Sequence, residues 1–178
     1  MLNDASQNLM ETIEHLSEVA LLNIETSKEN KPLNIKKYTS KILKSNLINA
    51  ENKGVEIIDN SKSYLVMGLE SYIESILTNL ITNAIKYSDP EKSSFIKLST
   101  DETIDYVKFI VEDNGLGINL NKYKDRIFKM YQKFHRNEDA RGIGLFLTKS
   151  QIEAIGGKIA VNSKEGVGST FTVYFKKP

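Results

Sequence analysis

Three polar side chains follow one stripe along a predicted helix, and their types suit the binding of a metal-bound nucleotide. Asn79, Asn83 and Tyr87 are spaced i, i+4 and i+8, and Lys86 lies beside them. A carboxamide oxygen is a neutral ligand that Mg²⁺ accepts when phosphates supply the other ligands. A lysine neutralises phosphate, and an aromatic ring packs on a base. The alternative is that these residues form the solvent-facing side of an amphipathic helix.

A second candidate site directly follows a predicted strand, in the run Asp113-Asn-Gly115-Leu-Gly117-Ile118. Glycines in this spacing let the backbone turn tightly and approach a ligand. An aspartate at the end of a strand can accept a hydrogen bond from an exocyclic amine, which would select adenine over guanine. A plain Asp-Asn-Gly turn is the alternative. A nicotinamide-cofactor fingerprint is disfavoured, because no G-x-G-x-x-G opens a helix here and no ribose-binding acid follows.

A third candidate site opens a predicted helix, where Arg141-Gly142-Ile-Gly144-Leu145 precedes the helical pattern. Backbone amides at the N-terminus of a helix attract phosphate. A single Gly-x-Gly is weak evidence by itself. Two such loops on either side of a polar segment are much harder to attribute to chance.

Alternating strands and helices are predicted to position the three sites. The predicted strands cover residues 55–58, 64–67, 95–100, 106–112, 158–162 and 170–175, and the predicted helices cover about 70–87 and 145–155. The first two strands flank a turn, and the other four form two hairpins. Strand pairs interleaved with helices predict an α+β fold, a two-layer α/β sandwich in which a mixed sheet carries helices on one face.

The part of the chain before Gly54 is polar, free of glycine and helical in pattern. A helical segment is therefore predicted for residues 1–53, and the folded domain for residues 54–178. A leucine recurs every seven residues near the N-terminus, which is typical of a narrow coiled-coil or hairpin seam. These leucines are Leu2, Leu9 and Leu16. Asn30-Lys31-Pro32 is predicted to break the helix before a second amphipathic pattern begins at Ile35.

Composition excludes several classes of chemistry. The chain has 178 residues, no cysteine and two histidines, which excludes thiol nucleophiles, zinc–thiolate sites and multi-histidine metal sites. Twenty-four Lys and Arg against 23 Asp and Glu give a net charge of +1, which provides no overall field to attract nucleic acid. No apolar run approaches the roughly 20 residues of a membrane span, so a cytoplasmic location is expected.

In order and spacing, the clusters resemble the catalytic, ATP-binding domain of bacterial two-component sensor histidine kinases, within the Bergerat-fold (GHKL) superfamily. Residues 79–87 are similar to the family's N box, 113–118 to its G1 box, 127–135 to its F box and 142–145 to its G2 box. The resemblance implies ATP and Mg²⁺ as cofactors, with Asn83 as the metal ligand and Asp113 as the reader of the adenine amine. The nucleotide-binding residues that it implies are Asn79, Asn83, Lys86, Tyr87, Asp113, Gly115, Gly117, Ile118, Arg141, Gly142, Gly144 and Leu145.

The resemblance also implies a mobile ATP lid from about Asn119 to Arg141, with Arg136 and Arg141 as cations for the triphosphate. The family's phosphoacceptor motif, close to His-Glu-Leu-Arg-x-Pro, is not matched, because His15 is followed by Leu-Ser-Glu and no proline. His135 falls in the lid region and is a poorer candidate still. We therefore expect no catalytic residue in this chain, and we expect the phosphoacceptor histidine and its base outside it.

The function implied is transfer of the γ-phosphoryl group of Mg-ATP to a histidine on a hairpin helix, in two-component signalling. Residues 1–53 would be the end of the second hairpin helix and a connector. The implied partners are the protein's own dimerisation helices, in a homodimer, and the receiver domain of a response regulator; nucleic acid is not expected. Two alternatives stay open: an ATPase clamp of the same superfamily, in which a glutamate occupies the position of Asn79, and a non-catalytic nucleotide-binding scaffold. Membrane attachment of the parent protein is left open.

Overall fold

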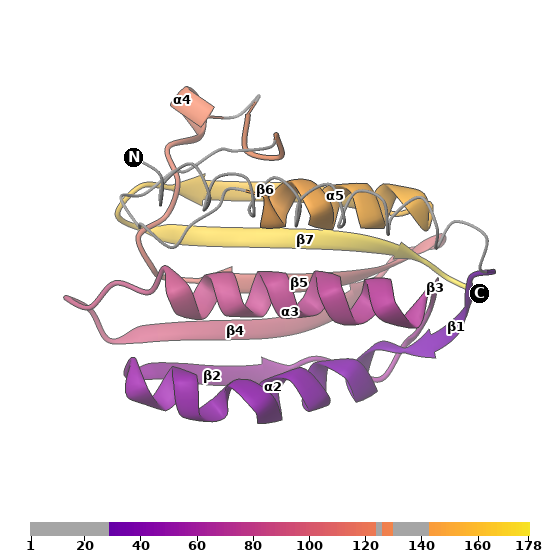
Figure 1. Cartoon of the computed structure of the whole chain (residues 1–178), viewed down its shortest axis with the longest axis horizontal. Coiled ribbons are helices and arrows are strands. Elements are labelled where there is room, and N and C mark those ends of the chain that lie inside the picture. Colours follow the sequence, from indigo (N-terminus) through magenta and orange to yellow (C-terminus); the bar gives the residue numbers. More distant parts are fainter. Residues whose placement is uncertain (1–28, 124–125, 130–142) are drawn as a thin grey trace, which may run out of the picture.

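The main feature of the computed structural model, which describes residues 29–123, 126–129 and 143–178, is a five-stranded mixed sheet (Figure 1). Its strand order is β2-β4-β5-β7-β6. The strands are β2 (Val55–Asn60), β4 (Ser94–Glu102), β5 (Tyr106–Asp113), β6 (Lys158–Lys164) and β7 (Gly168–Lys176). β2 runs parallel to β4, and the other neighbours in this sheet are antiparallel. Both predicted hairpins, β4–β5 and β6–β7, are thereby confirmed.

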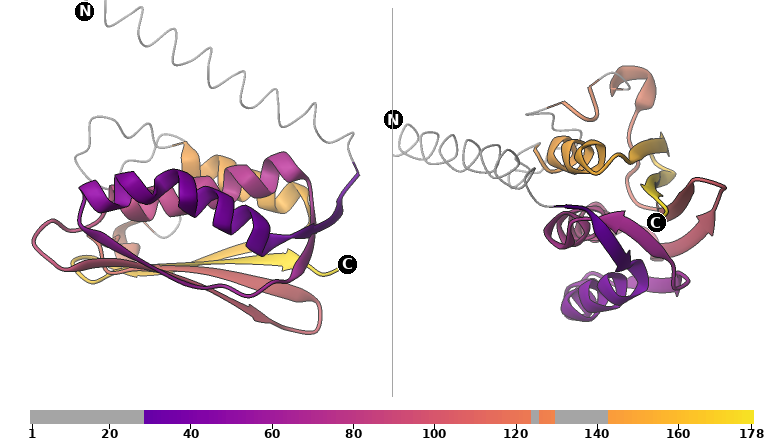
Figure 2. Two further views of the ribbon diagram at one scale, coloured as in Figure 1. Left: turned by 90° about the horizontal axis from the view of Figure 1, so that it is seen from below. Right: turned by 90° about the vertical axis from the view of Figure 1, so that its right-hand side faces the viewer.

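Three helices cover one face of this sheet: α2 (Ile35–Asn52), α3 (Glu70–Lys86) and α5 (Gly144–Ala154) (Figure 2, left). A short helix, α4 (Leu120–Tyr123), lies beside the edge of the sheet that β6 forms (Figure 1). The predicted fold class, a two-layer α/β sandwich with helices on one face of a mixed sheet, is therefore confirmed. The long helix predicted for residues 70–87 corresponds to α3, and the one predicted for 145–155 corresponds to α5.

A second, two-stranded sheet joins β1 (Lys31–Asn34) to β3 (Leu65–Gly68) in antiparallel pairing. The sequence pattern does not predict β1, because Pro32 indicates only the end of a helix. The strands predicted at 55–58 and 64–67 on either side of a turn are present, but they do not pair with each other as a hairpin would. β2 joins the five-stranded sheet through β4, whereas β3 pairs with β1.

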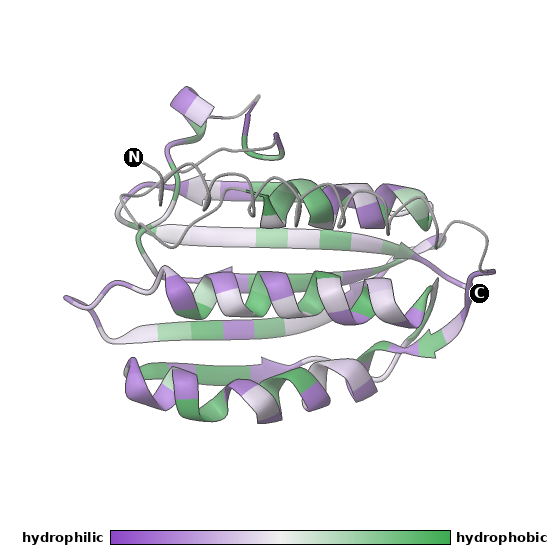
Figure 3. Cartoon of the chain, viewed as in Figure 1, coloured by the Kyte–Doolittle hydropathy of each residue, from purple (hydrophilic) through white to green (hydrophobic). Residues whose placement is uncertain are grey.

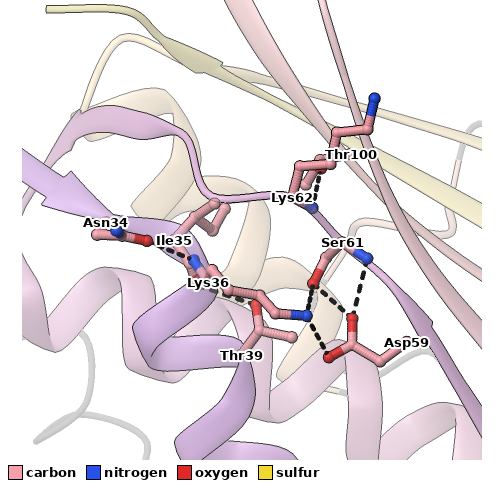
Figure 4. A network of polar contacts seen from close by, with 8 residues as sticks. All are labelled: Asn34, Ile35, Lys36, Thr39, Asp59, Ser61, Lys62 and Thr100. Atoms are coloured by element: carbon pink, nitrogen blue, oxygen red, sulfur yellow. Dashed lines mark hydrogen bonds and ion pairs between the residues drawn. The ribbon is translucent and has the colours of Figure 1, made fainter.

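A polar network explains why the chain between β2 and β3 crosses from one sheet to the other (Figure 4). Lys36 on α2 donates to the Asp59 carboxylate at 2.8 Å and to the Ser61 hydroxyl at 3.1 Å. The Lys62 backbone N–H donates to the Thr100 hydroxyl on β4 at 2.6 Å. Burial raises the pKa of Asp59, but hydrogen bonds from Lys36 and Ser61 outweigh burial and hold that pKa below its usual range. The segment is thus fixed to α2 and β4 instead of folding back on β2.

The core lies between the sheet and the inner faces of α3 and α2. Apolar residues recur on α3 with helical spacing, so one side of the helix is buried and the other is polar (Figure 3). The α3 side chains that are at most 1% exposed are Ile73, Ile76, Leu77, Leu80, Ile81 and Ile85. Each such burial contributes about 1.5–3 kcal/mol relative to exposure. α3, which carries several candidate site residues, is therefore firmly anchored in the core.

Residues 31–52 pack against the rest of the domain. α2 contacts α3 and β2, and its buried residues include Tyr38 and Ile42. Lys41 on α2 forms an ion pair with Glu74 on α3. The division of the chain at Gly54 stays a prediction, but these contacts favour a boundary before β1. Among the helices in the described ranges, none is both long and apolar enough to cross a bilayer.

Candidate functional site

The carboxamide stripe on α3 is linked by hydrogen bonds to α5. The Asn79 Nδ2 atom donates to the Thr148 hydroxyl at 2.7 Å, and the Asn83 Nδ2 atom donates to the Asn79 Oδ1 atom at 3.3 Å. Thr148 is only 1% exposed. Within the described part of the chain, nothing donates to the Asn83 Oδ1 atom. The orientation of this chain of amides therefore leaves a carboxamide oxygen of Asn83 available as a ligand.

Gly144, the first residue of α5, allows this close approach of the two helices. A Cβ atom at this position would overlap the Asn79 Oδ1 atom. Ile143 is buried, and Leu145 packs partly against the core. The structure thus brings the predicted residues Asn79, Gly144 and Leu145 to one place, whereas Arg141 and Gly142 lie outside the described residues.

Asp113 ends β5 in a partly buried position, and its carboxylate is fixed by the loop that follows. The Asp113 Oδ1 atom accepts the Gly115 N–H at 2.9 Å. Burial raises the pKa of Asp113 to about 6, although backbone N–H groups of Gly115 and Ser169 lower it. A partly buried carboxylate that accepts the Gly115 N–H has a defined direction, as the reading of an exocyclic amine requires.

The loop from Asp113 to Ile118 lies directly on the C-terminal end of α3. The Leu116 N–H donates to the Tyr87 carbonyl at 3.0 Å, and a Cβ atom on Gly115 would overlap that same oxygen. Lys86 lies beside Tyr87, with its Nζ atom 5.9 Å from the centroid of the ring. These contacts place Lys86 and Tyr87 next to the glycine loop, as the predicted site requires.

Gly117 adopts a left-handed conformation, with φ of 63°, where its loop meets the turn between β6 and β7. A Cβ atom at Gly117 would overlap the Lys164 carbonyl oxygen, so the backbones of the two segments touch. The next residue, Ile118, is buried, and its N–H donates to the Ser163 hydroxyl at 2.7 Å. Glycine is required here for both reasons, conformation and space.

A groove of about 600 Å³ runs along the outer side of the α3–α5 contact. Its walls are mostly hydroxyls and small apolar groups: Ser71, Glu74, Ser75, Thr78, Asn79, Thr82, Ile143, Gly144, Leu147 and Thr148. Of these lining residues only Glu74 carries a charge, and its carboxylate is paired with Lys41. The groove adjoins Asn79 and therefore borders the predicted metal and phosphate end of the site.

Residues 68–178 match the family described as histidine kinase-, DNA gyrase B-, and HSP90-like ATPases. The chain belongs to this ATPase family. ATP is therefore the nucleotide of its family, and the predicted resemblance to a histidine kinase ATPase domain is confirmed at the level of the family.

Individual relatives agree with this ATPase assignment. The heme sensor protein HssS of Staphylococcus saprophyticus is 28% identical over 145 residues, which are 82% of this chain and 31% of that protein. Among solved structures, the Acinetobacter baumannii histidine kinase AdeS has a TM-score of 0.73 at 23% identity, covering 96% of this chain and 79% of that one. Full-length ShkA in complex with AMPPNP has a TM-score of 0.77 at 23% identity, covering 98% of this chain and 37% of the ShkA chain. The structural likenesses show the fold, and the chain spans between about a sixth and a third of the curated relatives.

The donor set of this ATPase domain fits a magnesium nucleotide. Asn83 carries a carboxamide oxygen that no described residue donates to, and Asp113 carries a partly buried carboxylate. These are the groups that Mg²⁺ and an exocyclic amine need. The individual assignments of residues to metal and base stay predictions.

The predicted lid is described only in part. Asn119 caps the N-terminus of α4, because its carboxamide oxygen accepts the Lys122 N–H at 3.2 Å. Ile127 is buried, and Phe128 packs partly against the core, with the Lys149 Nζ atom 5.8 Å from its ring centroid. The predicted lid cations Arg136 and Arg141 lie outside the described residues, as do both histidines.

Sequence reasoning missed three hydroxyl residues of the site: Thr148, Ser163 and Ser169. Thr148 lies one helical turn after Gly144, and that spacing is a signal that could have placed it against Asn79. Ser163 and Ser169 flank the last turn, and their role depends on contacts with a loop far away in the sequence. No local pattern marks such contacts.

Proposed function

We propose that this chain is the ATP-binding kinase domain of a two-component sensor histidine kinase. It binds Mg-ATP and presents the γ-phosphoryl group to a histidine on a hairpin helix outside the residues described. Its membership of the ATPase family and the names of its relatives, which include a histidine kinase and sensor proteins, support the proposal.

The observation that carries the proposal is the carboxamide at Asn79. In the hydrolytic relatives implied by the resemblance, a glutamate in this position takes a proton from the attacking water. Asn79 has no basic site near neutral pH, and its amide is engaged by Thr148. The carboxylate of the adjoining groove, Glu74, is paired with Lys41. Because general-base help is worth about 10²–10⁴-fold, ATP should persist in this site until a better nucleophile arrives.

The proposed reaction transfers the γ-phosphoryl group of ATP to an imidazole nitrogen of the acceptor histidine. An imidazole nitrogen forms a P–N bond while the bond from phosphorus to the bridging oxygen of ADP breaks, and the imidazole gives up its proton to a base outside this chain. Asp113 and the glycine loop hold the adenine ring of the nucleotide. Lys86 and the N-terminus of α5 offset the negative charge of the phosphates. Mg²⁺, when bound by Asn83, supplies further charge neutralisation.

We extend the proposal to the partners and the organisation of the parent protein. A pair of hairpin helices would dimerise it and carry the phosphoacceptor, and the receiver domain of a response regulator would take the phosphoryl group. Residues before β1 would be the end of the second hairpin helix, and the catalytic domain would begin near Lys31. A cytoplasmic location follows from the use of ATP, while the parent protein is open to membrane attachment.

Labelled nucleotide tests the proposal directly. The full chain is incubated with γ-labelled ATP, alone and together with the hairpin segment of its parent protein. We expect ATP binding, very slow release of phosphate by the chain alone, and acid-labile, alkali-stable label on the hairpin only. Rapid phosphate release by the chain alone would favour the ATPase clamp, label on His15 or His135 would refute the expected acceptor, and no binding at millimolar ATP would favour the scaffold.

The metal assignment has its own test on α3. Asn83→Ala should remove most of the gain in ATP affinity that Mg²⁺ brings, because it deletes the available carboxamide oxygen. Thr82→Val is the control, since among the described residues the Thr82 hydroxyl donates to the Thr78 and Asn79 carbonyls of its own helix. Calorimetric titration with and without Mg²⁺ measures both variants. Equal losses in the two would mean that the helix, and not a ligand, is affected.

A further inference from the structure

The turn between β6 and β7 holds the glycine loop through a single hydroxyl. The Ser163 Oγ atom accepts the Ile118 N–H at 2.7 Å, donates to the Gly168 carbonyl at 2.9 Å, and lies 2.9 Å from the Ser169 Oγ atom. A serine hydroxyl has one hydrogen to donate and two lone pairs. With its hydrogen given to Gly168, Ser163 must accept from Ser169. Its hydrogen-bonding capacity is then fully used.

The two serines act on opposite ends of the loop. Ser163 holds Ile118, the last residue of the loop, through its hydroxyl. Ser169 faces Asp113, the first residue, in the β5–β7 pairing, and its backbone N–H lies close enough to the Asp113 carboxyl to lower the pKa of that group. Because the Ser163 and Ser169 hydroxyls bond each other, the direction of the carboxylate and the position of Ile118 are coupled through one pair of side chains.

Backbone contacts give this coupling little freedom. A Cβ atom at Gly168 would overlap the Asp113 carbonyl oxygen, and one at Gly117 would overlap the Lys164 carbonyl oxygen. The Gly166 N–H also donates to the Leu116 carbonyl at 2.8 Å. The loop and the turn therefore lie directly on each other, and a small change at Ser163 must be transmitted to the loop.

The same turn also contacts the start of the lid. The Glu165 carboxylate accepts from the Asn119 amide at 3.1 Å, and the other end of that amide accepts the Lys122 N–H that opens α4. Asn119 directly follows Ile118, the residue that Ser163 holds. The turn thus fixes both the base-reading loop and the first residues of the lid.

We propose that Ser163, through its hydrogen bonds with Ile118 and Ser169, is a positioning residue that sets the discrimination of adenine from guanine by Asp113. The inference rests on the proposed function, since it assumes that this loop receives the base. A residue that only supports the fold would, when shortened, weaken all nucleotides alike. A residue that aims the Asp113 carboxylate would, when shortened, weaken adenine nucleotides more than guanine nucleotides.

Calorimetric titration of the full chain with ATP and with GTP separates these two roles. Ser163→Ala should weaken ATP binding by about five- to thirtyfold and GTP binding much less, so that the ATP-to-GTP preference falls by a similar factor. Ser163→Thr keeps the hydroxyl and should restore the preference to within about threefold. Ser99→Ala is the matched control, because Ser99 is a half-buried serine of β4 for which the described residues offer no side-chain hydrogen bond.

Ser169→Ala provides a second route if Ser163→Ala folds poorly. It deletes the hydroxyl that donates to Ser163 but keeps the backbone N–H that reaches Asp113, so a smaller loss of preference in the same direction is expected. Equal weakening of ATP and GTP, or an unchanged preference, in the folded variants would overturn the positioning role. Absence of ATP binding by the unmodified chain would instead refute the proposed function itself.

Discussion

Thr148 is the residue through which α5 fixes the orientation of the predicted metal ligand, and Thr148→Val tests that link. Valine keeps the shape of the side chain but removes the acceptor for the Asn79 amide, 2.7 Å away. Since Thr148 is 1% exposed, water cannot easily replace the lost partner. The Asn79 donor itself is only half-buried and borders the groove, so the loss of this hydrogen bond should lower the free energy of unfolding by about 0.5–1.5 kcal/mol.

A double-mutant cycle distinguishes the hydrogen bond from simple packing. The Asn79→Ala variant has no donor for Thr148. Adding Thr148→Val to it should therefore reduce the free energy of unfolding much less than Thr148→Val does in the unmodified chain, which corresponds to a coupling energy of about 1 kcal/mol or more. Urea denaturation of the unmodified chain, the two single variants and the double variant measures the four free energies of unfolding. Additivity within about 0.5 kcal/mol would refute the link, because independent sites behave in that way.

Three further predictions concern the loop that ends at Ile118 and the β6–β7 turn that contacts it. Asp113→Ala should weaken ATP binding by about ten- to a hundredfold, since a hydrogen bond to an ionised group is worth about 1.5–3 kcal/mol; unchanged affinity in a titration would contradict the base-reading role. The pKa of Asp113 is raised by burial to about 6, so the native state holds this proton more tightly than the unfolded chain does. The contribution of Asp113 to stability should therefore be greatest below about pH 4 and be lost as pH rises through about 6. Denaturation of the unmodified chain and of Asp113→Asn at several pH values measures this contribution as the difference in their free energies of unfolding. A difference that grows as pH rises would contradict the raised pKa. Gly168→Ala should lower the free energy of unfolding by more than about 3 kcal/mol, because the new Cβ atom overlaps the Asp113 carbonyl. Gly166 has a φ of 75° and open space around it, so Gly166→Ala should lower the free energy of unfolding by about 1–2 kcal/mol. Thermal unfolding should therefore show the larger loss in Gly168→Ala.

The parts of the fold that were predicted correctly depend on local sequence. The apolar spacing of Ile73, Leu77 and Leu80 predicts α3, and the polar turn from Asp101 to Asp105 predicts the β4–β5 hairpin. In each case, neighbours in sequence are neighbours in space. The candidate site residues on these elements could be found for the same reason, because helical spacing alone places Asn79 and Asn83 on one face.

The parts that were missed depend on long-range pairing. The residues of β2 fit a hairpin with β3 as well as they fit a parallel partner, and only the packed domain selects β4. Pro32 in β1 lacks the N–H of a normal ladder and is tolerated in this short outer pair. Ser163 acquires its role when Ile118, distant in the sequence, reaches its hydroxyl.

The parallel pairing of β2 with β4 has a consequence for synthesis of the protein. Val55 pairs with Ser94 and Asn60 with Ser99, so β2 leaves the ribosome well before the strand that it needs. At about 5–20 residues per second, it waits for roughly 2–8 seconds with its backbone groups unpaired. During this time β2 offers the edge on which nascent chains can associate. Charged residues within β2 and beside it, Glu56, Asp59 and Lys62, oppose such association until β4 emerges from the ribosome.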